Sequence, residues 1–226
     1  MFGDHRTACS TSSVLKRRAG PAEKTWARVC REAKGLVRER VPLKELNLPL
    51  LQEEDGRQLE VEVTGLPLYH GQQLALDATL VAPLTRSGEP RPKAWHEDGA
   101  ALTEARKRKE RRYPELLQEG SRCRLVVLET ETRGRWSEEA FDFVDQLARA
   151  TARSAPPALR TSAWLSWLRR WTSLVSVAAQ DSLATTLLTG DALGFCHLDG
   201  TTPELCEVLG ADRWAEAPSF SRLAAA

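Results

Sequence analysis

The sequence lacks a long apolar run, a Cys-x-x-Cys pair and an excess of one charge. No stretch approaches the roughly 18–20 apolar residues that a bilayer-crossing helix needs, and no secretory signal pattern opens the chain. We therefore expect a soluble protein that is not secreted and has no membrane partner. The five cysteines are widely spaced and odd in number, which favours a reducing compartment. The net charge of +1 excludes a polycation that binds nucleic acid over its whole surface.

The composition is that of an ordinary globular protein, with 42% hydrophobic and 28% charged residues. A length of 226 residues suits one substantial domain, alone or with appendages. Charge is nevertheless concentrated locally, because residues 105–113, ARKRKERRY, hold six basic residues and one glutamate. The pattern predicts one strongly basic helix on an otherwise balanced surface.

Hydrophobic periodicity predicts a mixed order of helices and strands. Apolar residues at helical spacing predict helices over about 21–40, 99–118, 137–153 and 158–188, with Asp98 and Ser137 as N-caps. Alternation or apolar runs predict strands over 57–65, 72–81 and 123–131, and a doubtful edge strand over 41–50. This order predicts an α/β (α+β) domain, in which a mixed sheet of about four strands is flanked by helices.

Composition shifts divide the chain into four parts. Residues 1–20 are polar and without periodicity, so we expect a flexible N-terminal segment. Residues 21–155 form the core domain, 156–189 a C-terminal amphipathic helix, and 190–226 an irregular tail.

An aspartate interrupts the apolar strand QQLALDATLV at position 77. The even positions of this strand are apolar, so Asp77 and Thr79 share the other face. In RQLEVEVTG, Leu59, Val61 and Val63 are expected on one face, and Glu60 and Glu62 on the other.

If the two strands are antiparallel neighbours, their carboxylates lie close enough to repel, unless a proton or a cation such as Mg²⁺ lies between them. Lys109 falls on the apolar stripe of the helix over 99–118 and is directed toward the same face. Carboxylates with a lysine beside a basic helix suit a metal-dependent phosphodiesterase. The same residues also suit a solvated strand face and a lysine that extends past apolar surface to water.

Several local patterns resemble the restriction-endonuclease-like region that follows the reverse transcriptase in non-LTR retrotransposon polyproteins. They are FGDHRTAC (2–9), LALDATLV (74–81), GAALTEARKRKERRYPEL (99–116), CRLVVLETETRGRWSEEA (123–140) and the final WLSWLRRWTSLVSVAAQDSLATTLL (164–188). The resemblance covers about residues 2–188 in the order of that family.

This resemblance implies a PD-(D/E)xK nuclease core that nicks DNA with Mg²⁺ in association with reverse transcription, in the nucleus. Asp77 matches the second acid of the family, and Lys109 matches a lysine that has moved onto the helix. The family's first acid belongs to a Pro-Asp pair that this sequence lacks. Val61 lies nearest that position, and either Glu60 or Glu62 is a candidate substitute.

The resemblance also implies a nucleic-acid surface on the basic helix, with DNA as the partner and RNA as an alternative. Arg106, Arg108 and Arg112 are the candidate phosphate contacts, and Tyr113 is the residue expected to orient the helix. The basic cluster is more typical of a solvated helix face than of phosphate contacts.

The opening pattern matches half of the family's zinc motif. His5 and Cys9 are two candidate ligands, whereas a structural zinc ion takes four, so zinc is not expected here. The missing half and the missing Pro-Asp pair imply a truncated or relic copy. The alternative function is then an inactive, intracellular module that binds nucleic acid or a partner without cutting.

Overall fold

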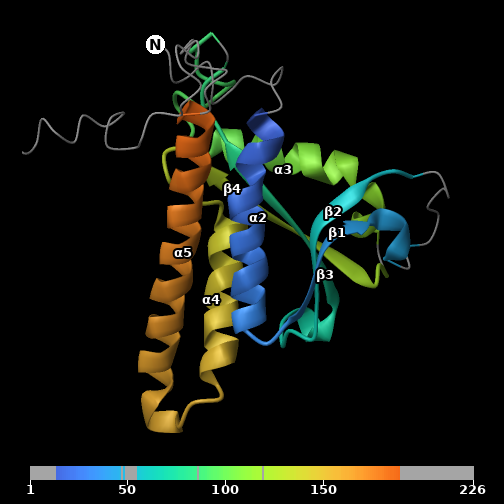
Figure 1. The fold of residues 1–226 in the computed structure, drawn as a ribbon, viewed down its shortest axis with the longest axis vertical. Helices are drawn as coiled ribbons and strands as arrows, with labels where there is room; N and C mark the ends of the chain where they lie inside the picture. The colour runs from blue at the N-terminus through green and yellow to red at the C-terminus, as the bar shows by residue number, and fades with distance from the viewer. Residues whose placement is uncertain (1–13, 47, 49–54, 86, 119, 189–226) are drawn as a thin grey trace, which may run out of the picture. The chain divides into compact units, whose positions relative to one another are not determined.

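A computed structural model describes residues 14–46, 48, 55–85, 87–118 and 120–188. It confirms the mixed α/β class, because a four-stranded sheet of order β1-β2-β3-β4 is flanked by helices (Figure 1). The strands are β1 (Leu36–Pro42), β2 (Gln58–Thr64), β3 (Gln73–Val81) and β4 (Cys123–Glu131). The first three are antiparallel neighbours, and β4 runs parallel to β3.

Helices cover both faces of this sheet (Figure 1). The helices α2 (Val14–Glu32), α4 (Glu138–Ala152) and α5 (Arg160–Leu188) pack together on one face, and α3 (Ala100–Arg112) crosses the other. Since α3 connects the parallel strands β3 and β4, it is the crossover helix that such a step requires. None of the helices in the described part of the chain combines enough length with enough apolar character to cross a membrane.

The larger apolar core lies between the sheet and the three helices. Its centre is Trp26 of α2, whose ring meets Trp136 and Phe143 edge to face, at centroid distances of 5.8 and 6.0 Å. Trp171 of α5 is fully buried in the same core, and its indole N–H donates to Glu32 at 2.9 Å. The predicted boundary between residues 155 and 156 therefore separates two helices, α4 and α5, that share one core.

The opposite face of the sheet has a smaller apolar cluster beside the end of α3. Ala75 of β3 and Val127 of β4 lie in it together with Tyr113, which follows α3. Leu59 also lies in this cluster, whereas Val61 and Val63 lie in the larger core. The prediction that Leu59 shares one face of its strand with Val61 and Val63 is therefore wrong. The pairing of β2 with β3 covers only Val61–Val63 and does not extend to Leu59.

The predicted helix over 21–40 is wrong at both ends. It starts at Val14, inside the segment predicted to be flexible, and ends at Glu32. Lys34 then adopts a φ of 70°, and a Cβ on Gly35 would lie 2.8 Å from Val63. This tight turn reverses the chain direction, and residues 36–42 then pair with β2. Most of these residues were predicted to be helical, and only 41–42 were predicted as strand. Tertiary pairing thus overrides the helical spacing.

The structure also tests the predicted ends of two other helices, α3 and α4. Asp98 does not cap α3; the N-cap is Gly99, with a φ of 75°, and Asp98 instead pairs with Arg135. Helix α3 stops at Arg112, because the residue before Pro114 is disfavoured in helical geometry. The cap at Ser137 is confirmed, since its hydroxyl oxygen accepts the Ala140 N–H at 3.2 Å.

Candidate active site

Asp77 lies in the middle of β3, between β2 and β4, and is completely buried. The hydroxyl of Thr79, on the same face of the strand, donates to Asp77 Oδ1 at 3.1 Å. Asp77 Oδ2 is buried and accepts no hydrogen bond within the described part of the chain. A buried carboxylate oxygen without a donor is costly, so Asp77 is poorly suited to a purely structural role.

Lys109, in the last turn of α3, is the cation that faces Asp77. Its ammonium forms an ion pair with Asp77 Oδ1 and lies 3.7 Å from Glu60 Oε1. The Lys109 side chain is only 19% exposed, so this pair is poorly screened by solvent. The structure therefore brings together three residues that the sequence singled out: Glu60, Asp77 and Lys109.

Glu60 reaches this cluster because β2 and β3 separate beyond Val61. The Ala78 N–H is consequently free of the strand ladder, and Glu60 Oε2 accepts its hydrogen bond at 2.5 Å. Burial and the nearby negative charge of Asp77 raise the pKa of Glu60 to about 8, although Lys109 opposes the shift. Glu60 thus holds a proton at neutral pH unless a cation replaces that proton.

Glu62 does not belong to this cluster. It pairs in register with Ala75, and its carboxylate accepts hydrogen bonds from Arg38 and Gln73. The structure therefore separates the two glutamates that the sequence left as alternatives: Glu60 contacts the lysine, and Glu62 satisfies an arginine in the sheet.

Glu23 of α2 is an acid that the sequence did not single out. It lines the same cavity as Glu60 and Lys109. Burial raises its pKa, and the charge of Asp77 adds to the increase while Arg40 and Lys109 oppose it. In the sequence Glu23 is an ordinary polar residue near the start of an amphipathic helix, so only the packing of α2 on the sheet reveals it.

Glu23, Glu60 and Lys109 border a cavity of about 520 Å³ beside the sheet, and Asp77 is buried behind them. Arg40 and Arg112 contribute positive charge to its lining. The Arg112 guanidinium lies 5.5 Å from the centre of the Tyr113 ring. Tyr113 is buried, and its hydroxyl donates to the Gln58 carbonyl at 3.3 Å, which ties the end of α3 to β2. The orienting role of Tyr113 stays a prediction, for which this hydrogen bond supplies a physical means.

The three predicted phosphate contacts have different surroundings. Arg112 borders the cavity, whereas Arg108 is exposed on α3 and does not line it. Arg106 forms ion pairs with Glu110, at 2.9 Å, and with Glu139 of α4. Of the three, only Arg112 is positioned to contact a phosphate that also reaches Lys109.

The donor set suits a hard divalent cation. Mg²⁺ is usually held by one or two carboxylates and several waters, and Asp77 Oδ2 and Glu60 supply that number of groups. Within the described ranges, no cluster of three or more His, Cys, Asp or Glu side chains has a metal-holding arrangement. The candidate zinc ligands His5 and Cys9 lie outside the described residues.

Comparison with known proteins adds no identification: no protein-family model and no curated protein matches this chain.

Proposed function

We propose that this chain is a metal-dependent DNA nuclease domain of the restriction-endonuclease-like kind. One observation carries the proposal: the Lys109 ammonium contacts both Asp77 and Glu60 at the edge of a cavity with a basic rim. A buried aspartate with one oxygen that has no partner among the described residues, a second acid with a raised pKa and a lysine form a combination typical of catalytic sites.

In this proposal Asp77 and Glu60 hold Mg²⁺, with Glu23 near enough to bind one of its waters. The bound cation would polarise a phosphodiester oxygen and lower the pKa of a water molecule. Lys109 stabilises the negative charge that develops on the phosphate during attack. Arg112 and Arg40 orient the nucleic-acid backbone on the rim of the cavity.

The biological setting that we propose follows the sequence resemblance. A nick in DNA leaves a 3′ end from which a reverse transcriptase can start synthesis. Since a retrotransposon inserts into genomic DNA, we propose that this chain acts on DNA in the nucleus. The order of elements in the described part, a helix, three antiparallel strands, a helix and a parallel strand, supports this proposal.

A second candidate is a module that binds DNA without cutting it. The raised pKa of Glu60 favours this candidate, since a protonated glutamate binds cations weakly at neutral pH. The ion pair between Lys109 and Asp77 also neutralises the other acid. The two candidates therefore differ in whether a divalent cation displaces the Glu60 proton.

Plasmid nicking in the presence of Mg²⁺ or Mn²⁺ distinguishes the candidates, with wild type and Asp77→Ala compared at equal concentration. We expect the wild type to convert supercoiled plasmid to the nicked circle, and Asp77→Ala to be at least about a hundredfold slower. Equal nicking by both proteins would refute the role of Asp77. Salt-sensitive DNA binding without nicking would support the second candidate.

A further inference from the structure

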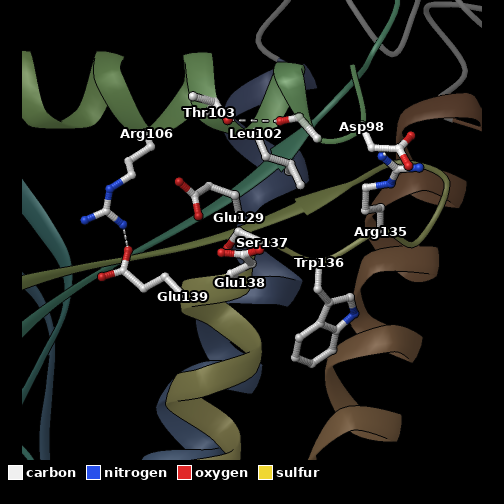
Figure 2. A pocket seen from close by; sticks show the side chains of 11 residues that line it. Asp98, Leu102, Thr103, Arg106, Glu129, Arg135, Trp136, Ser137, Glu138 and Glu139 are labelled. Atoms are coloured by element: carbon white, nitrogen blue, oxygen red, sulfur yellow. Dashed lines mark hydrogen bonds and ion pairs between the residues drawn. The ribbon is translucent and has the colours of Figure 1, made fainter. Parts of the chain in front are cut away.

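A second cavity, of about 750 Å³, lies between α3 and the first turn of α4 (Figure 2). Its lining comes from the start of α3, the end of β4, the following turn and the first turn of α4. None of the proposed catalytic groups lines it. Figure 2 shows Arg106, Glu129 and Glu139 around the space between α3 and α4.

Glu129 is the unusual residue of this cavity. It is 1% exposed, and its Oε2 atom is buried without a hydrogen-bond partner among the described residues. Glu129 pairs in register with Thr79, so it lies on the same sheet face as Asp77, two residues farther along. Figure 2 shows its carboxyl group directed toward α3, into the space that the cavity occupies. A nearly buried acceptor directed into an empty space indicates a ligand that donates a hydrogen bond.

Most other polar groups of the cavity already have partners. Arg106 pairs with Glu139 and Glu110, and Arg135 pairs with Asp98 at 2.9 Å. The Thr103 hydroxyl donates to the Gly99 carbonyl, and the Ser137 hydroxyl accepts the Ala140 N–H. Glu138 also lines the cavity but is exposed, so Glu129 is the buried polar group left for a ligand.

Charge in the cavity argues against an anionic ligand. Four carboxyl groups line it, Asp98, Glu129, Glu138 and Glu139, against two guanidinium groups, Arg106 and Arg135. Burial raises the pKa of Glu129, while the Ser137 hydroxyl and Arg106 oppose the shift. The groups that face Glu129 thus favour a neutral ligand with N–H donors over a phosphate or a carboxylate.

The remaining lining is apolar. Leu102 of α3 forms one wall. Trp136 also lines the cavity near the start of α4, but Figure 2 shows its ring directed away from α3, toward the core where it meets Trp26. A flat heteroaromatic ring with an amino group combines the properties that this lining requires, because one face can contact Leu102 and its edge can donate to the Glu129 carboxyl group.

We propose that this cavity binds an unpaired nucleobase carrying an exocyclic amino group, on the strand whose phosphate lies at Lys109. The inference rests on the proposed function for its choice of DNA as the ligand. Arg106 precedes Lys109 by three positions on α3, about 4.5 Å along the helix axis, so neighbouring parts of one strand can reach both cavities. Glu129 accepts the amino N–H, as glutamate does from cytosine N4.

The test uses equilibrium binding of short fluorescent oligo(dC) and oligo(dT) to the full chain in EDTA, where no metal-dependent cleavage occurs. These probes have pyrimidine rings of the same size, but only cytosine carries an exocyclic amine. We expect oligo(dC) to bind about tenfold more tightly than oligo(dT), and Glu129→Met to bind both equally. Glu104→Gln, an exposed carboxyl change on the same helix, should keep the preference.

Thermal unfolding accompanies the binding measurement. Glu129→Met is expected to keep or raise the melting temperature, because it removes a buried Oε2 acceptor that has no partner in the described part of the chain. Equal binding of oligo(dC) and oligo(dT) by the wild type would overturn the proposal of a base pocket, whatever the result for Glu129→Met. A preserved preference in folded Glu129→Met would also overturn it. A dC preference in a protein that never nicks plasmid would uphold the base pocket and reject only the nuclease.

Discussion

Lys109 near the end of α3 forms an ion pair with Asp77 in the centre of β3, and the same ammonium lies 3.7 Å from Glu60. This single nitrogen connects the crossover helix to two neighbouring strands. Because Asp77 is fully buried, the lysine is the cation that makes its negative charge tolerable in the interior.

Replacing Lys109 by Met tests both roles of this lysine. Removing one partner of a buried ion pair typically costs about 3–5 kcal/mol of unfolding free energy, so we expect a marked loss of stability without metal. The unpaired carboxylates should then bind Mg²⁺ more strongly, which predicts a larger Mg²⁺-induced rise in melting temperature than in wild type. Nicking should fall at least about a hundredfold.

The control for this variant is Lys107→Met, an exposed change on the same helix. It should unfold and nick like the wild type. A Mg²⁺-induced shift in Lys109→Met that is no larger than in wild type would contradict the assignment of Asp77 and Glu60 as cation ligands.

The two neighbouring glutamates of β2 should behave differently when each is changed to Gln. Glu60→Gln removes a carboxylate beside Lys109 and Asp77, so we expect nicking to drop by about a hundredfold or more while the fold is kept. Glu62→Gln removes the buried one of the two carboxylates that pair with Arg38 and should lower stability by about 1–3 kcal/mol with nicking nearly intact. Denaturant unfolding and plasmid nicking measure the two effects, and the opposite pattern would assign the metal to Glu62.

The raised pKa of Glu60 predicts how stability depends on pH. From the ordinary pKa of 4.5 to about 8, the folded state holds a proton on Glu60 that the unfolded state releases. Unfolding free energy therefore falls as pH rises through this window, by up to about 2 kcal/mol between pH 6 and 7.5. Glu23 and Glu129, whose pKa values are also raised, contribute with the same sign.

Glu60→Gln isolates the contribution of this residue, because it leaves Glu23 and Glu129 in place. Its unfolding free energy, measured with urea at several pH values, should vary less with pH than that of the wild type. Mg²⁺ binding by the wild type should strengthen from pH 6 to 8, since the cation competes with the proton. Parallel stability profiles for the two proteins would contradict the protonation of Glu60.

Arg112 is expected to contact the nucleic-acid backbone more closely than Arg108. Arg112→Ala removes a charge that borders the Lys109 cavity, so the slope of log binding constant against log salt should decrease by about 1. Arg108→Ala removes an exposed charge of the same helix away from the cavity and should change the slope less. Fluorescence anisotropy over a salt series measures both slopes, and equal slopes for the variants would show that no discrete phosphate contact is made at Arg112.

The sequence alone predicted the element order, three of the four strands and the chemical types in the site. Alternation identified β2, and the apolar runs around Asp77 and over 123–131 identified β3 and β4. These patterns are local, because burial on one face of a strand repeats every second residue. Asp77 was conspicuous for the same reason, since a carboxylate in an apolar strand requires a partner.

Only the tertiary structure decided which acids meet. Glu60 and Glu62 have the same parity, and the choice between them depends on where β2 separates from β3 and frees the Ala78 N–H for Glu60. Glu23 lines the first cavity because α2 packs on the sheet, and Glu129 lines the second because β4 pairs in parallel register with β3. No local spacing in the sequence encodes either arrangement. Strand β1 was missed as well, because its charged sequence becomes a strand only by pairing with β2. Local periodicity determines which face of an element is buried, but long-range pairing determines which polar groups are left facing one another.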